Sequence, residues 1–364
     1  CSGSSSGADV SRRHDPHKGR GAVSSPDNRY AAWQREAFDD GWSDEPDPEP
    51  APATTLIPHK TRQILSYNDS PDLAFDRTLN PYRGCEHGCI YCYARPTHAW
   101  LDESPGRDFE TRIHYRPDAA ERLRAELDRP GYQPETIALG MNTDAYQPAE
   151  RQLGITRSVL EVCRDTRHPV SLVTKSALVE RDLDILGPMA EAGLATVAVS
   201  ITTLDSDLDR RLEPRAAGPR RRLATIRRLR EAGIPVGVLV APVIPVLTEA
   251  EFEAILEAAA GAGASWAGYV LLRLPHELGD LFRDWLDEHA PGQAEHILSR
   301  VQQARGGKDY EPSFGRRMTG EGPWADLLAQ RFRLARRKFD LEWPPVLDTA
   351  AFTPPGGRQG DLFD

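Results

Sequence analysis

The chain has 364 residues, of which 39% are hydrophobic, and its formal net charge is −10. This length allows one large domain or two ordinary ones, and the negative charge argues against a protein that binds nucleic acid over its whole surface. Because the sequence has neither an apolar run of about eighteen residues nor a basic segment followed by an apolar one, we expect no membrane-spanning helix and no signal peptide.

The amino-terminal part is polar. Residues 1–55 are rich in Ser, Asp and Pro and predict a flexible tail and linker, although 19–42 contains enough aromatic residues to dock on the main domain. The chain begins at Cys1 in "CSGSSSGAD", which is similar to the start of a mature lipoprotein. A truncated start is the favoured interpretation, because clustered thiols indicate a reducing compartment, and we expect a cytoplasmic protein.

Short apolar strands alternate with helical segments over residues 56–275. Strands are expected at 75–82, 136–141, 169–175, 195–202, 235–244 and 266–274, and helices at 118–130, 156–165, 181–193, 219–233 and 248–263. In the last helix Thr248 and Glu251 are spaced as a capping box. Continuous apolar strands are typical of parallel strands buried on both faces. The predicted fold is therefore α/β, a partial (β/α)6 TIM-like barrel.

The pattern changes after the barrel. Residues 276–345 predict a helical extension with helices at 279–289, 293–305 and 324–338, and residues 346–364 predict a flexible tail. In parallel α/β proteins the functional site lies where strands end and loops begin. The unusual residues of this chain follow the expected strands, so we look for the site there.

Three of the five cysteines follow the first expected strand. Cys85, Cys89 and Cys92 are spaced C-x3-C-x2-C, and Gly84 and Gly88 allow tight folding of the loop. Three thiolates would hold three irons of a cubane cluster and leave the fourth iron without a protein ligand. An open coordination position distinguishes catalytic from structural metal sites, so the fourth iron could bind a substrate or cofactor.

Two other interpretations of the cysteine loop remain open. One is a zinc site completed by His87 or His98, and the other is an electron-transfer cluster with a distant fourth ligand. Cys163 lies on an apolar helical stretch and is expected to be a buried structural thiol.

The cysteine spacing, with the aromatic Tyr91 directly before Cys92, resembles the signature of the radical S-adenosylmethionine (radical SAM) superfamily. Within it, "NPYRGCEHGCIYCYARPTHAWL", "NTDAYQPAE", "VTKS" and "PRAAGPRRRLATIRRLREAGIPVGVLVAPVIP" resemble the spore-photoproduct-lyase-like branch, often called "DNA repair photolyase". The resemblance covers about residues 62–274. It implies a radical enzyme with a 4Fe-4S cluster and S-adenosylmethionine as cofactors, and an external one-electron reductant of the flavodoxin or ferredoxin type.

The resemblance also implies cofactor contacts at the strand ends. Asn142, Thr143 and Asp144 would contact the methionine amino group, and Lys175, Ser176 and Ser200 the ribose and carboxylate. Tyr91 also belongs to the expected cofactor-binding residues. Arg215 is a candidate for the cofactor carboxylate, with Glu213 as an alternative partner for its guanidinium. A plain turn at 142–144 is the alternative to a binding role. Strand 235–244 would flank the adenine.

One position departs from the photoproduct lyases, which carry a cysteine at the end of the second strand, where this chain has Met141. Repair of the spore photoproduct is therefore doubtful. Nine arginines between Arg210 and Arg230 favour either a solvated helix face or nucleic-acid binding. The candidate substrates are nucleic acid, a protein or peptide, and a small metabolite. A zinc-binding module without turnover is the alternative from another class, and a monomer is expected.

Overall fold

The computed structural model describes residues 19–30 and 53–356. Its main sheet has seven strands in the order β10-β9-β8-β7-β6-β3-β2. The six parallel strands of this sheet are β3 (Arg77–Leu79), β6 (Ile137–Leu139), β7 (Val170–Thr174), β8 (Ala195–Ser200), β9 (Val236–Val243) and β10 (Trp266–Leu271), and β2 (Leu65–Tyr67) pairs antiparallel with β3. The predicted α/β fold with six barrel strands is confirmed.

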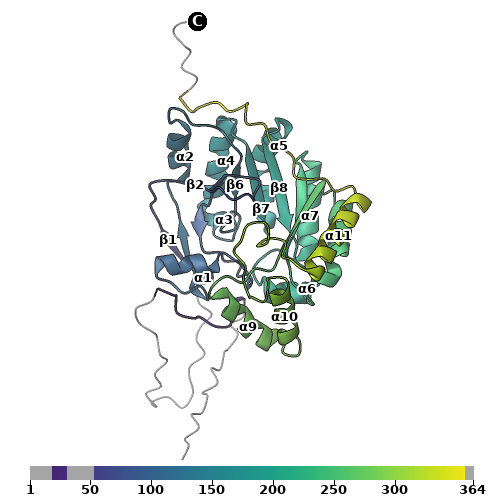
Figure 1. Cartoon of the computed structure of the whole chain (residues 1–364). Coiled ribbons are helices and arrows are strands. Elements are labelled where there is room, and N and C mark those ends of the chain that lie inside the picture. Colours follow the sequence, from purple (N-terminus) through teal and green to yellow (C-terminus); the bar gives the residue numbers. More distant parts are fainter. Residues whose placement is uncertain (1–18, 31–52, 357–364) are drawn as a thin grey trace, which may run out of the picture.

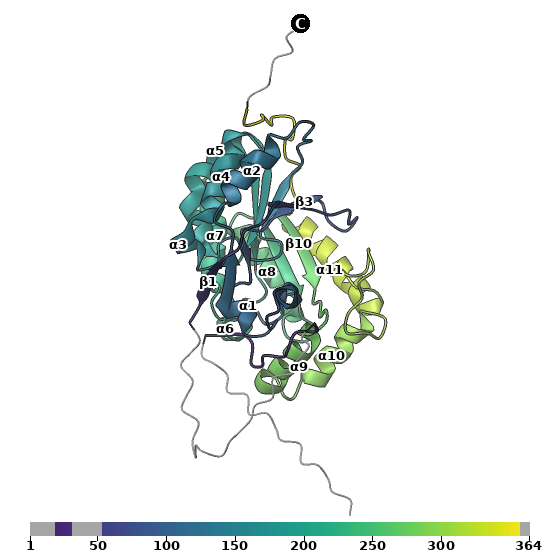
Figure 2. The same ribbon diagram turned by 90° about the vertical axis from the view of Figure 1, so that its left-hand side faces the viewer.

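Helices cover the outer face of the sheet (Figures 1 and 2). They are α2 (Ala119–Leu127), α4 (Ile155–Asp165), α5 (Leu183–Glu191), α7 (Pro219–Glu231) and α8 (Phe252–Gly261), with the short α3 (Glu150–Leu153) and α6 (Ser206–Leu212) and the 3-10 turns η2 (Ala177–Asp182) and η3 (Glu249–Glu251) between them. All six residues of β8 are buried, as expected for a central parallel strand. The main apolar core lies between this sheet and these helices, and it includes the fully buried thiol of Cys163.

Two features of the barrel helices bear on the sequence predictions. Gly193 and Gly233 follow α5 and α7 with φ of 72° and 76°, the left-handed conformation that ends many helices. The capping box at Thr248 and Glu251 is wrong, because α8 begins after a 3-10 turn and the Thr248 hydroxyl accepts from the Ile244 amide (2.9 Å). The Glu251 carboxylate instead accepts the Leu204 amide in the loop after β8 (3.1 Å).

Beside the barrel lies a second, three-stranded sheet that the sequence did not indicate. It contains β1 (Thr55–Pro58), β5 (Arg112–Tyr115) and β4 (Tyr82–Arg83), in the order β1-β5-β4, with η1 (Arg95–Leu101) and α1 (Asp108–Thr111) next to it. Its strands have only two to four residues, too few to show a period of two. Because β4 leads directly into Gly84, this sheet forms one wall of the cysteine loop.

The carboxyl-terminal helices are α9 (Leu278–His289), α10 (Ala294–Gln303) and α11 (Pro323–Lys338), close to the predicted ranges. α11 packs on α8, whereas α9 and α10 gather around Trp285 at the other end of the molecule (Figure 1). Beyond them, Phe352 is buried against Tyr132 and His168. None of the helices in the described ranges is long and apolar enough to cross a bilayer. Residues 1–18, which include Cys1, and residues 31–52 and 357–364 lie outside the described residues.

Candidate active site

The cysteine loop begins where β4 ends. Gly84 has a φ of 80°, and a Cβ there would lie 2.9 Å from the Phe109 carbonyl oxygen, so both the conformation and the space require glycine. The Cys85 amide donates to that same carbonyl at 2.9 Å. On the other side, the Ile90 amide donates to the Leu212 carbonyl (3.1 Å), which ties the loop to the end of α6. The loop is thus held from both walls of the barrel mouth.

The three thiols of this loop converge. Cys85 and Cys89 are buried and Cys92 is half-buried, and Cys92 packs against both of the apolar groups that contain the other two. Burial raises the pKa of the Cys89 and Cys92 thiols, and the nearby Cys85 raises both further. Buried thiols that raise one another's pKa gain most from a bound metal, which stabilises the thiolates and offsets their repulsion. The donor set therefore fits an iron–sulfur cluster.

The residues after β6 brace the loop from inside. The Thr143 hydroxyl donates to the Gly84 carbonyl at 2.6 Å, and Gln147 donates from its side chain to the same oxygen at 3.2 Å. Gln147 also accepts from the Glu86 amide at 3.0 Å. The backbone amide of the half-buried Asn142 donates to the Asn80 side chain (2.9 Å). Of the predicted 142–144 group, Thr143 is thus engaged with the loop itself.

Asp144 is buried and its oxygens accept several hydrogen bonds. The donors are the Thr174 hydroxyl and the amides of Lys175 and Tyr146, each at 2.8 Å, and His87 Nδ1 lies 3.3 Å away. Burial would raise the pKa of Asp144, but His87 and these donors outweigh it and lower the pKa to about 2. Asp144 is therefore a carboxylate that joins the cysteine loop to the end of β7.

His87 is also fully engaged by this contact. Its burial would lower its pKa, but Asp144 and Cys85 raise it to about 10, so the ring is held as a cation. A protonated imidazole is not a zinc ligand, because a ligating histidine must be neutral. Zinc binding through His87 would displace this proton, as metal binding to histidine generally does.

A cluster of polar side chains lies inside the barrel at the ends of β7 and β8. Lys175 Nζ donates to Ser200 Oγ at 2.9 Å and lies 5.7 Å from the centre of the Tyr91 ring. Ser200 in turn donates to the Ala241 carbonyl on β9 at 3.1 Å. These side chains face the cysteine loop through Tyr91. The Ser176 hydroxyl, by contrast, accepts from the Leu178 amide (3.2 Å) and caps η2.

A buried ion pair that the sequence did not indicate lies beside Tyr91. Arg222 and Glu213 are both at most 1% exposed and form a short contact, and Asp209 lies 3.2 Å from Arg222. The Tyr91 hydroxyl donates to Glu213 and lies 3.0 Å from the Thr202 hydroxyl. Burial and the Glu213 carboxylate raise the pKa of Tyr91, which keeps its hydroxyl protonated.

Glu213 therefore does not hold Arg215, and that alternative is wrong. Arg215 instead pairs with Glu86 of the cysteine loop at 3.1 Å, and its amide donates to the His87 carbonyl at 3.2 Å. Because the chain turns between α6 and α7, neighbouring residues 213 and 215 point to different partners. Arg215 braces the loop from outside, with its side chain one third exposed.

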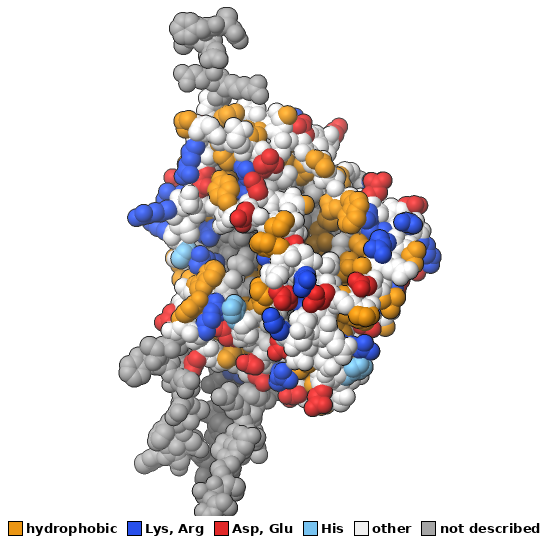
Figure 3. Space-filling model, in the orientation of Figure 1, with side chains coloured by type: hydrophobic (Ala, Val, Ile, Leu, Met, Phe, Trp, Pro, Cys, Tyr) orange, Lys and Arg blue, Asp and Glu red, His pale blue; other side chains and the backbone are white. Residues whose placement is uncertain are grey.

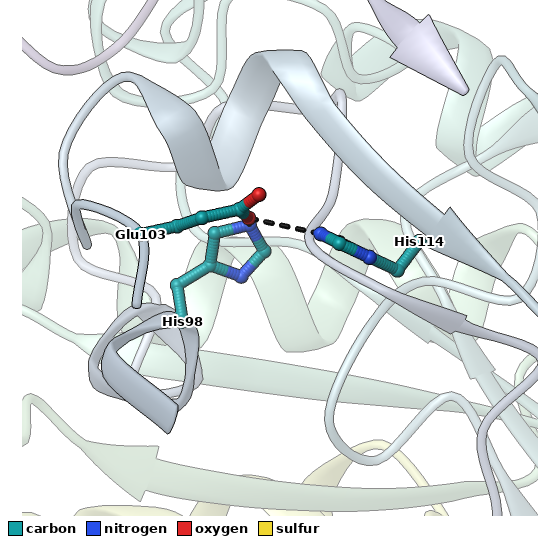
Figure 4. Close-up of side chains that lie close together, drawn as sticks. All are labelled: His98, Glu103 and His114. Atoms are coloured by element: carbon teal, nitrogen blue, oxygen red, sulfur yellow. Dashed lines mark hydrogen bonds and ion pairs between the residues drawn. The ribbon is translucent and has the colours of Figure 1, made fainter. Parts of the chain in front are cut away.

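His98 belongs to a separate cluster of polar side chains, formed with Glu103 and His114 (Figure 4). Glu103 accepts from Arg112 at 2.5 Å and lies 2.9 Å from His114 Nε2 and 3.2 Å from His98 Nε2. Burial would raise the pKa of Glu103, but these three partners lower it to about 2. One ligand atom from each of His98, Glu103 and His114 lies within 4.8 Å of the other two, which is close enough for the three to bind one cation. Hydrogen bonds already account for both carboxylate oxygens, so we assign this group a structural role in holding η1 against β5.

Five of the nine arginines in the segment 210–230 form ion pairs. Ion pairs join Arg210 to Asp207, Arg215 to Glu86, Arg221 and Arg228 to Glu180, and Arg222 to Glu213. Figure 3 shows a different face of the molecule, on which basic and acidic side chains are also interspersed. The structure therefore favours the solvated-helix interpretation of this segment.

The chain matches known proteins along the part that carries this site. The family model of the "Radical SAM superfamily" matches residues 79–259, a range that begins just before the cysteine loop. Uncharacterized protein Rv2578c of Mycobacterium tuberculosis is 38% identical over 265 residues, 72% of this chain and 76% of that protein. Uncharacterized protein MJ0683 of Methanocaldococcus jannaschii is 26% identical over 246 residues, 68% of this chain and 88% of that protein.

Solved structures with a similar fold include spore photoproduct lyase complexed with dinucleoside spore photoproduct. That structure gives a TM-score of 0.55 at 16% identity, over 78% of this chain and 79% of the other. At this identity the likeness concerns the fold. Together with the matched family model and the 38% identical relative, it shows that this chain belongs to the radical SAM superfamily and is a radical SAM enzyme.

Proposed function

We propose that Cys85, Cys89 and Cys92 hold a 4Fe-4S cluster whose remaining iron binds S-adenosylmethionine. The observation that supports this most strongly is the convergence of three buried or half-buried thiols in one loop at the barrel mouth. When bound, the cluster supplies one electron that cleaves S-adenosylmethionine and yields a 5′-deoxyadenosyl radical able to abstract hydrogen from a substrate.

The chain's own residues have two roles in this proposal. Lys175 and Ser200 would bind the cofactor carboxylate and ribose, since an ammonium and a hydroxyl suit these groups and both lie at strand ends facing Tyr91. Asn142, whose side chain is half-buried, would accept from the methionine amino group. Asp144 and Arg215, which are already engaged, would position the loop.

Anaerobic reconstitution with iron and sulfide, followed by reduction, tests this function. We expect a paramagnetic reduced cluster whose electron paramagnetic resonance spectrum changes when S-adenosylmethionine is added, together with formation of 5′-deoxyadenosine. One zinc per chain with no iron in anaerobically purified protein would contradict the proposal and support the zinc-binding module.

Our second proposal concerns the substrate of this enzyme, for which nucleic acid is the candidate class. Tyr93, which follows the last cysteine, is 45% exposed, and the Arg273 guanidinium lies 5.1 Å from its ring centre and 5.8 Å from that of Tyr310. An exposed aromatic ring with an arginine beside it is typical of surfaces that stack unpaired bases. This surface, rather than the arginine-rich helix α7, now carries the nucleic-acid hypothesis.

Binding of a short single-stranded DNA at several salt concentrations tests this candidate. We expect log affinity to fall linearly with log salt, and Tyr93→Ala to weaken binding about tenfold because one stacking contact contributes about 1–3 kcal/mol. Arg227→Gln on α7 is the control and should leave the affinity unchanged. Undetectable binding of the wild-type protein at low salt would favour a protein, peptide or metabolite substrate.

A further inference from the structure

Residues 19–30, here called the amino-terminal arm, lie across the outer side of the cysteine loop. In Figures 1 and 2 the arm is the purple segment that runs between α1 and α9. Ala22 and Val23 are buried there, 1% and 3% exposed. Gly21 lies so close to the loop that a Cβ on it would be 1.8 Å from the Gly88 carbonyl oxygen. The arm is thus in direct contact with Gly88, the residue before Cys89.

A buried ion pair joins the arm to the loop. The Glu110 carboxylate, 0% exposed, accepts the amides of Gly21 (2.9 Å) and Ala22 (2.8 Å). Its other partner is Arg95, also 0% exposed, at 2.5 Å. Arg95 donates at the same time to the carbonyls of Gly88 (3.0 Å) and Cys89 (2.9 Å). Glu110 therefore binds the arm directly and binds the cysteine loop through Arg95.

The other end of the arm reaches the carboxyl-terminal helix α9. The Ser24 hydroxyl donates to Asp284 on α9 at 2.5 Å. Arg29 pairs with Glu277 at 2.9 Å and donates to the Pro96 carbonyl of η1 at 3.3 Å. Since η1 follows the cysteine loop and α9 follows the last barrel strand β10, the arm links the cysteine loop to the carboxyl-terminal helices.

We propose that the amino-terminal arm is part of the cluster site, with Gly21 and Glu110 as positioning residues for the cysteine loop. The inference rests on the proposed function, because it concerns the cluster that this loop would hold. A buried ion pair is stable only while its hydrogen bonds are complete, and the arm amides complete those of Glu110. Any change in loop shape on cluster loading is therefore coupled to arm docking, and the coupling is reciprocal.

Amide hydrogen exchange of residues 21–23, followed by mass spectrometry, measures the first direction of this coupling. We compare the anaerobically reconstituted protein with the same protein after chelator has removed the iron. We expect exchange in the arm to be about tenfold slower with the cluster present, within the 5- to 150-fold range of coupled sites. Equal exchange in the two states would overturn the proposal.

Substitution in the arm measures the reverse direction. Gly21→Ala places a methyl group against the Gly88 carbonyl and should lower the iron retained per chain severalfold and alter the paramagnetic spectrum of the reduced cluster. Gly261→Ala on α8 is the matched control, since a Cβ there meets no atom outside its own helix within 4 Å, and it should retain full iron. Full iron and an unchanged spectrum in Gly21→Ala would overturn the arm's role.

The two proposals fail in different ways. If the wild-type protein takes up no iron cluster, both the proposed function and this inference are wrong. A wild-type protein that holds a cluster and forms 5′-deoxyadenosine, but whose arm exchanges equally with and without iron, removes only the inference.

Discussion

Replacement of Cys85, Cys89 and Cys92 together by alanine is expected to abolish formation of 5′-deoxyadenosine. The three thiolates are the iron ligands in our proposal, and three alanines leave the irons with no protein ligand in this loop. We expect no cluster absorbance after reconstitution and product below detection, measured by chromatography of the reaction with S-adenosylmethionine and a reductant.

Cys163→Ala is the matched control for this experiment. Its thiol is also buried, but it lies in the main apolar core between α4 and the sheet, and burial alone raises its pKa to about 12. We expect this variant to load the cluster normally and to lose about 1 kcal/mol of stability from the removed sulfur. If the triple variant still forms 5′-deoxyadenosine, the assignment of the loop is wrong.

Glu213→Gln is expected to destabilise the folded protein by several times more than a surface substitution does. It removes the charge that compensates Arg222, which is 1% exposed, and leaves only Asp209 at 3.2 Å. Breaking a buried ion pair by removing one partner costs about 3–5 kcal/mol, because the remaining charge stays buried. Because Asp209 still partly compensates the charge of Arg222, we expect a loss of free energy of unfolding near the lower end of this range, at about 3 kcal/mol. Urea unfolding measures it.

The control for Glu213 is an ion pair at the surface. Asp207→Asn removes the partner of Arg210, and the two side chains are 79% and 72% exposed. Exposed pairs contribute about 0–1 kcal/mol, so this variant should unfold at nearly the wild-type urea concentration. Equal losses in the two variants would show that the buried pair is not a stabilising element. Formation of 5′-deoxyadenosine should also fall in Glu213→Gln, because Tyr91 loses its charged acceptor.

The sequence was sufficient for the parts of this protein that depend on local spacing. The barrel strands are apolar runs of ordinary length between helices with a clear period, and the structure places them close to the predicted ranges. The cysteine motif is equally local, since its three ligands lie within eight residues. For these features the neighbours that matter are close in the chain, and the pattern of residue types reports them.

The small sheet and the arm depend on distant parts of the chain. β1 pairs with β5 more than fifty residues later, and each strand is too short to show a period. The arm binds Glu110 almost ninety residues away through backbone amides, which any residue type supplies. No residue pattern reports a contact of this kind, because its donors are common to all amino acids.

The same distinction separates the site residues. The spacing of Cys85, Cys89 and Cys92 by itself predicts a metal site, because three thiolates in one loop are typical metal ligands. The partners of charged residues followed only from the tertiary structure. Glu213 and Arg215 are two positions apart, yet one pairs with Arg222 in the barrel and the other with Glu86 in the loop. Charge alone does not choose between partners, and the choice depends on burial and on the direction of each side chain, which long-range packing sets.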